Sequence, residues 1–316
     1  MPTIIPIECK FGPTSAYAYF IAAEKPALID TGVRGSATKE IQEVLAQNGY
    51  HIEDIEYILL THAHVDHIGG AYDVWQATNE QATVVISHNE AYLALDRENH
   101  VVDYDALQGQ YVDAQRQQQH KEMLLADIGD SFPIVQQVAD GAIIDLGSDV
   151  KLRVVHTPGH SIGSVTYVLE RERYAFCADA VQIAGGAKSS IPAIEFPALY
   201  RKSITRLLEE VQPTRLYAGH RFKDAHGVYD AVIDGEDVTR ALHASLATDD
   251  HLQQLAKAHV TRRGHSKEGI YAPFQEIAEN LQYTADPRHL PCAFFVTMRG
   301  YVAEYLEIQQ RKVIST

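Results

Sequence analysis

The feature that most constrains this chain is a cluster of metal-binding side chains placed directly after an apolar run. Residues 55–60 read Ile-Glu-Tyr-Ile-Leu-Leu and predict a strand. The cluster that follows comprises His62, His64, Asp66 and His67. Residues two apart in an extended segment point the same way, so the imidazoles of His62 and His64 can converge on one ion. Asp66 and His67 would diverge unless the chain turns, and after a turn they could serve a second ion.

Three further residues end other predicted strands and could complete such a site. His160 follows a Pro-Gly break after an apolar strand, Asp179 closes the run Tyr-Ala-Phe-Cys-Ala, and His220 closes Leu-Tyr-Ala-Gly. Two ions of zinc type need roughly seven to nine protein donors, with a position open for water in a catalytic site. Strand ends gathered on one edge of a sheet would bring these side chains together.

The chain at this point resembles a known family. The motif His-x-His-x-Asp-His at 62–67, with Gly69-Gly70 behind it, resembles the signature of the metallo-β-lactamase fold superfamily of binuclear metallohydrolases. The other elements follow that family's order: Ile-Asp-Thr-Gly with Asp30, Thr-Pro-Gly-His with His160, then Asp179 and Gly-His with His220. The resemblance covers about residues 15–225 and implies an α/β fold, the αββα sandwich.

By position, the resemblance implies two ligand sets and one bridge. One metal ion would be held by His62, His64 and His160, and the other by Asp66, His67 and His220. Asp179 would bridge the two ions, which makes Asp66 and Asp179 the candidate catalytic carboxylates. Asp30 would orient a ligand histidine from behind without touching a metal. Such nitrogen-rich, thiolate-free ligands favour two Zn²⁺ ions, and iron or manganese is compatible with them.

Most other histidines have no ligand spacing. His156 lies within a strand, four residues before His160, and is expected to pack or to support a ligand. Ten isolated histidines are expected to be surface or hydrogen-bonded residues: His51, His88, His100, His120, His226, His243, His251, His259, His265 and His289.

Composition and charge favour a water-soluble enzyme. With 316 residues, of which 46% are hydrophobic, the chain can bury a sizeable core. The net charge of −15 disfavours nucleic acid, because binding to phosphates rests on Lys and Arg. No apolar window of membrane-spanning length occurs and the N-terminus does not resemble a signal peptide, so we expect a cytoplasmic protein without membrane contact. Cys9, Cys177 and Cys292 are too scattered to indicate a disulfide framework or a thiolate site.

Hydrophobic periodicity predicts strands and helices in two runs, as the sandwich requires. Strands are expected at 16–22, 26–30, 55–60, 82–87, 134–138, 143–146, 152–156, 164–169, 174–178 and 216–219. Helices are expected at 36–48 and 196–211. Residues 89–133 carry no strand signal and read as a helical insert near the rim of the site, with a Gln-rich helix at 108–125.

The character of the sequence changes near residue 230. We therefore divide the chain into a metal-binding catalytic domain at 1–230 and a helical C-terminal appendage at 231–316, with helices at 236–258, 267–281 and 291–310. In the superfamily that the chain resembles, such additions often cover the metal cleft, so the appendage could form a substrate cap. Residues 293–296, Ala-Phe-Phe-Val, could line a pocket or pack in a core, and packing is expected.

Two ions close together predict a hydrolase that needs no side-chain nucleophile. Water held between two divalent cations becomes hydroxide at neutral pH, and the same ions polarise a carbonyl. No Gly-x-Ser-x-Gly elbow occurs. The expected reaction is cleavage of an ester, thioester or lactone in a small acyl substrate by a metal-bridging hydroxide. A homo-oligomer is compatible with the sequence.

Subfamily features leave alternatives open. Quorum-signal lactonases, members of the same superfamily, carry a tyrosine three residues after the bridging aspartate, where this chain has Gln182. The helical insert and C-terminus look most like glyoxalase II-like thioesterases. A mononuclear iron sulfur dioxygenase uses the same scaffold, as does a non-catalytic ligand-sensing regulator. The complete set of seven ligands favours the hydrolase.

Overall fold

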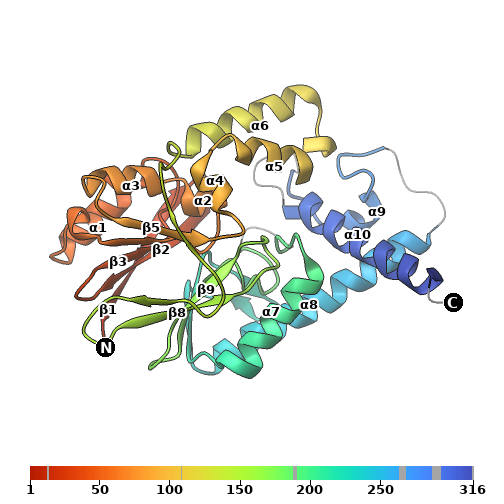
Figure 1. Ribbon diagram of the computed structural model, residues 1–316. Helices are drawn as coiled ribbons and strands as arrows, with labels where there is room; N and C mark the ends of the chain where they lie inside the picture. Colours follow the sequence, from red (N-terminus) through yellow and green to blue (C-terminus); the bar gives the residue numbers. More distant parts are fainter. Residues whose placement is uncertain (13, 108, 188–190, 263–267, 287–292, 315–316) are drawn as a thin grey trace.

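The computed structural model shows two mixed β-sheets stacked face to face, with helices on their outer faces (Figure 1). It describes residues 1–12, 14–107, 109–187, 191–262, 268–286 and 293–314. The expected αββα sandwich is therefore confirmed. Within the described ranges, no helix is long and apolar enough to cross a membrane.

The first sheet has six strands in the order β1-β2-β3-β4-β5-β6. They span Thr3–Phe11, Thr14–Ala22, Ala27–Ile29, Tyr57–Leu59, Thr83–Ser87 and Gln136–Val138. The first three are antiparallel and the last four run parallel, β3 belonging to both sets. Strand β1 corrects the sequence-based prediction, which began its first strand at residue 16. Its alternation of exposed residues with buried Ile5, Ile7 and Cys9 is the period of a strand with one face on the core.

The second sheet has the order β14-β11-β10-β9-β8-β7. In that order its strands span Val232–Asp234, Arg215–Ala218, Tyr174–Ala178, Val165–Leu169, Lys151–His156 and Ile143–Asp145. Only β10 and β11 pair in parallel. Strand β14 and the short hairpin of β12 (Lys223–Asp224) and β13 (Gly227–Val228) were not predicted from the sequence. Two or three residues carry too little periodicity to be recognised.

Aromatic rings fill the space between the sheets. Tyr19 of the first sheet packs edge-on against Phe176 and Tyr217 of the second, with ring centroids 5.9 and 5.0 Å apart. Tyr167 donates a 2.9 Å hydrogen bond to the Leu60 carbonyl across the sheets. These contacts fix the two sheets against each other at the level of the His62–His67 segment.

Helices cover the outer face of each sheet. The first sheet carries η1 (Ala37–Ile41), α1 (Gln42–Gln47), η2 (Ile52–Asp54), α2 (Val65–Ile68) and α3 (Ala71–Ala77). The second carries α7 (Pro197–Arg206) and η4 (Leu207–Val211). Apolar side chains of each layer join those of its sheet in a continuous buried cluster.

The insert is helical, as predicted, although its boundaries differ. It contains α4 (Ala91–Leu95), α5 (Asn99–Leu107), η3 (Gly109–Tyr111) and α6 (Ala114–Asp127). The long helix begins later than expected because the Asp113 carboxylate accepts a 2.9 Å hydrogen bond from the Arg116 N–H and caps it.

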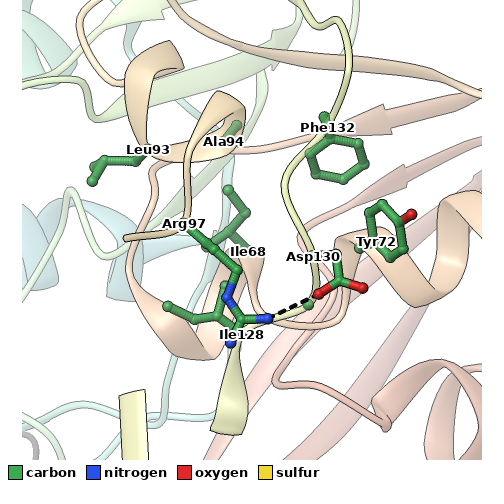
Figure 2. A pocket seen from close by; sticks show the side chains of 9 residues that line it. Ile68, Tyr72, Leu93, Ala94, Arg97, Ile128, Asp130 and Phe132 are labelled. Carbon is green, nitrogen blue, oxygen red and sulfur yellow. Dashed lines mark hydrogen bonds and ion pairs between the residues drawn. The ribbon is translucent and has the colours of Figure 1, made fainter. Parts of the chain in front are cut away.

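A small cavity lies where the insert meets the sandwich (Figure 2). At about 10 Å³ it has room for roughly one water molecule. Arg97 spans it and pairs with Asp130 at 3.0 Å, beside the ring of Tyr72 and the side chain of Ile68. Packing therefore holds the insert against the sandwich, and the ion pair ties the two ends of the insert together.

The C-terminal segment consists of α8 (Glu236–Thr261), α9 (Gln275–Asn280) and α10 (Ala293–Ile314). Within the described residues, the predicted helix at 267–281 is wrong over 268–274, since α9 starts only after Pro273, which lacks a donor for a preceding turn. Residues 263–267, with His265, and 287–292, with His289 and Cys292, lie outside the described residues. Phe294 and Phe295 are buried, which confirms packing.

The C-terminal helices share one buried cluster with the second sheet. They also meet the insert, because the Tyr111 ring stacks on Phe295 with centroids 4.6 Å apart and an interplanar angle of 8°. Figure 1 shows α5 beside α10 on the same side of the sandwich. The boundary near residue 230 stays a prediction from sequence.

We predict that Tyr301→Phe destabilises the protein through its contact with Asp249. The fully buried Asp249 carboxylate accepts a 2.7 Å hydrogen bond from the Tyr301 hydroxyl and pairs with Arg201 at 2.6 Å. Loss of one partner should lower the free energy of unfolding by about 1–3 kcal/mol in urea titrations. Tyr305→Phe, one turn along α10 at a partly exposed ring, is the control and should be neutral. Equal effects of the two changes would contradict the prediction.

Candidate metal centre

All seven predicted ligands lie together at one end of the sandwich. They follow β4, β8, β10 and β11, whose carboxyl ends meet at this edge. Three overlapping groups have one ligand atom per residue within 4.8 Å of the others. The groups are His62, His64 and His160; His62, His67 and Asp179; and Asp66, His67 and His220.

The turn required for two ligand sets is present. Beyond β4 the chain bends at Thr61 and is extended at His64, whose φ and ψ are −70° and 150°. It then enters α2, and this single helical turn directs Asp66 and His67 to one side. The Thr61 carbonyl accepts a 2.9 Å hydrogen bond from the Val165 N–H, which ties the loop to the second sheet.

Each imidazole of the first group is anchored through the nitrogen that faces away from the centre. The His160 Nδ1–H donates to the Ala193 carbonyl at 2.7 Å, and the His64 Nε2–H to the Glu195 carboxylate at 3.2 Å. These acceptors place a proton on the outward-facing nitrogen of each ring. The Thr61 hydroxyl donates to Asp30 and therefore accepts from His62 Nδ1, at 3.0 Å.

The remaining nitrogens of the three rings point at one another. His160 Nε2 lies 2.7 Å from His64 Nδ1 and 3.1 Å from His62 Nε2. Burial would lower the pKa of His64, but its hydrogen bond to Glu195 and the Glu195 charge raise it to about 9, so His64 Nδ1 also carries a proton and donates it to His160 Nε2. Metal binding would displace this proton. Three convergent imidazole lone pairs form the donor set of a zinc-type cation, so the residues present fit such an ion.

The second group is built in the same way. The His67 Nδ1–H donates to Asp30 Oδ2 at 2.9 Å, and the His220 Nδ1–H donates to the Ser15 carbonyl at 2.7 Å. Their Nε2 atoms face Asp66 Oδ2 at 3.9 and 3.1 Å. Within the described chain, the buried His67 Nε2 has no hydrogen-bond partner, which is the state of a nitrogen reserved for a metal.

Asp179 lies between the two groups. Its Oδ2 atom is 3.5 Å from His160 Nε2 and 3.4 Å from His220 Nε2, so it faces one histidine of each group. Its Oδ1 atom is buried without a hydrogen-bond partner among the described residues. A β-carbon on Gly219 would lie 2.2 Å from this oxygen, so only glycine leaves room for the carboxylate here.

The electrostatics suit a cation. Burial and the neighbouring imidazoles hold the pKa of His62 far below its usual range and lower the pKa of His160 to about 3, so both rings stay neutral. Burial would raise the pKa of Asp179, but His220 and His160 reverse this and lower it. Burial would likewise lower the pKa of His220, yet Asp179 and Asp66 raise it. Metal binding would displace a proton from such a ring.

Sequence reasoning missed two carboxylates beside the site. Glu195 contacts His64, and Glu90 joins two ligand loops by accepting hydrogen bonds from the Ala63 N–H (2.8 Å) and the Gly163 N–H (2.9 Å). Neither residue has a recognisable spacing to the ligands. Asp30, by contrast, lies behind His67 where it was expected. His156 bonds the Ile162 carbonyl at 3.0 Å and stays outside the three groups.

Comparison with known proteins identifies the family. The sequence pattern of the metallo-beta-lactamase superfamily matches residues 11–220, about two thirds of the chain. The chain therefore belongs to the metallo-beta-lactamase superfamily, most of whose members are hydrolytic metalloenzymes.

Among its relatives are hydroxyacylglutathione hydrolases. The protein of that name from Rhodopseudomonas palustris is 27% identical over 274 residues, which cover 86% of this chain and 84% of the relative. One from a Methylobacterium species is 26% identical, with 78% and 77% covered. A metallo-beta-lactamase family protein from Thermus thermophilus has the same fold, with a TM-score of 0.69 at 20% identity over 98% of this chain and 94% of that one.

We predict that Asp30→Asn weakens metal binding. Asp30 Oδ2 accepts hydrogen bonds from both His67 Nδ1 and the Thr61 hydroxyl, and an amide nitrogen in its place would face two donors. Affinity should fall roughly 10- to 100-fold in a chelator competition. Asp224→Asn is the control, because Asp224 bonds the His226 N–H at 2.7 Å in an exposed turn and lies outside the three ligand groups. An unchanged titration would exclude Asp30 from the site.

Proposed function

We propose that the protein is a binuclear metal-dependent hydrolase of an ester-type acyl bond, with a thioester as the preferred class. The position of Asp179 between two histidine-containing groups carries the proposal. His62, His64 and His160 would hold one ion, Asp66, His67 and His220 the other, and Asp179 both. Zinc is the proposed metal because the ligands are imidazole and carboxylate without thiolate.

The two ions would supply water acidified to act at neutral pH and Lewis-acid polarisation of the acyl carbonyl. The chain's own contribution is orientation and exclusion of water. Outside hydrogen bonds direct the ligand nitrogens at the centre, and the ionised carboxylates of Asp66 and Asp179 would offset the positive charge of the ions. His64 has a side chain that is 38% exposed, whereas that of His67 is fully buried, so substrate would approach from the side of His64.

The relatives, together with the helical insert and the C-terminal helices, support an acyl substrate. The hydroxyacylglutathione hydrolases match over most of both chains, which favours a small thioester substrate. The stacking of Tyr111 on Phe295 joins the insert to the C-terminal helices on one side of the sandwich, and together they would form the substrate cap. A mononuclear iron centre is disfavoured, because ligands for two ions are present.

A substrate screen on protein of known metal content tests the proposal. Protein loaded with zinc, manganese or iron would be assayed against glutathione and coenzyme A thioesters, lactones and simple esters, with metal content measured in parallel. Two ions per chain and turnover of an acyl bond are the expected result. One iron per chain, with oxygen consumption and no hydrolysis, would replace the proposal with an oxygenase.

We predict that Asp179→Ala abolishes hydrolysis and lowers metal content. The side chain faces both groups, whereas the aromatic core between the sheets lies elsewhere, so the circular dichroism spectrum should not change. Asp140→Ala is the control, since Asp140 pairs with Arg206 on the surface. Full activity of Asp179→Ala would contradict a shared carboxylate.

A further inference from the structure

A short segment before α7 orients two ligands of the first group. Within residues 192–195, the Ala193 carbonyl accepts the His160 Nδ1–H at 2.7 Å and the Glu195 carboxylate accepts the His64 Nε2–H at 3.2 Å. Freed from these acceptors, either imidazole could turn an N–H toward the centre. The partly exposed His64 ring has the most freedom to do so. The position of this segment therefore decides whether two lone pairs face the metal.

The segment is held from behind by α10. The Thr297 hydroxyl donates to the Pro192 carbonyl at 2.7 Å and accepts from the Ile194 N–H at 3.0 Å, so a single side chain binds the backbone on both sides of Ala193. Thr297 has no exposed surface. A buried hydroxyl that both donates and accepts is expensive to replace with an apolar group.

Further contacts hold the same segment on both sides. A β-carbon on Gly300, one turn after Thr297, would lie 2.6 Å from the Glu195 carbonyl oxygen, so the helix and the segment touch directly. On the other side, the Glu195 and Phe196 N–H groups both bond the Gly159 carbonyl at 2.9 Å, next to His160. Gln182 adds a contact, its side-chain oxygen accepting from the Ala193 N–H at 3.0 Å.

We propose that α10 acts as a clamp on the metal centre, with Thr297 as the positioning residue that keeps His64 and His160 oriented for binding. This inference rests on the ligand roles proposed above. Its distinctive consequence is selectivity between the two ions. The second group is oriented by Asp30 and Ser15 of the sandwich, which α10 does not support. Loosening the contacts of α10 should therefore weaken the binding of one ion and leave the binding of the other unchanged.

The test is a pair of substitutions at Thr297. Thr297→Val keeps the shape but removes both hydrogen bonds, whereas Thr297→Ser retains the hydroxyl. Zinc binding would be measured by competition with a chromophoric chelator, and ligation by the absorption of the cobalt-substituted protein. We expect Thr297→Val to weaken one of two sites roughly 10- to 100-fold, as loss of outer support does at histidine ligands. Thr297→Ser should retain most of the affinity.

Controls separate the clamp from general stability. Thr261→Val removes a helix hydroxyl that bonds the Lys257 carbonyl at 2.9 Å at the exposed end of α8, and it should bind both ions normally. Glu195→Ala removes one acceptor without touching Thr297 and should weaken the same site. If Thr297→Val fails to fold, Glu195→Ala is the variant that tests the proposal.

The outcomes distinguish the clamp from the proposed function. If the unaltered protein binds no pair of ions, the binuclear proposal itself fails. If it binds two, and Thr297→Val or Glu195→Ala binds both as tightly or loses both equally, only the clamp is overturned. Selective loss of one ion, with rescue by Thr297→Ser, supports it.

Discussion

The structure depends on a cluster of polar atoms whose hydrogen-bonding capacity is not filled by other protein groups. Imidazole nitrogens and carboxylate oxygens converge at the end of the sandwich, and His67 Nε2 and Asp179 Oδ1 are buried there without hydrogen-bond partners among the described residues. Burying such groups unpaired costs free energy, which a cation between them would offset. The strand directions, the turn at α2 and the glycine at 219 all serve to bring these atoms together.

The two ligand groups draw their support from different parts of the chain. Asp30 and the Ser15 carbonyl, both in the N-terminal half, orient His67 and His220. In the first group, His64 and His160 instead rely on a segment near residue 193, which the C-terminal helix α10 holds. The C-terminal helices are thus part of the architecture of the site, which explains why they share a buried cluster with the second sheet.

The ligands could be predicted from sequence because strand periodicity and motif spacing are local. His62 and His64 follow an apolar run, and Asp179 and His220 end others, so knowing the strands places the ligands. Glu195 and Thr297 could not be found, because their roles arise only when segments about a hundred or more residues apart in sequence meet. Strand β1 was missed although its alternation was readable, and α9 was predicted too long because apolar spacing was counted through Pro273.

One helix contacts both the insert and the segment that orients two of the predicted metal ligands. Phe295 of α10 stacks on Tyr111 of the insert, and Thr297, two residues later, binds the segment that orients His64 and His160. A shift of α10 large enough to part Tyr111 from Phe295 would also strain the hydrogen bonds of Thr297, because a helix moves as a rigid rod over two residues. If the insert and α10 form the proposed substrate cap, a movement that opens the cap would also loosen the support of His64 and His160.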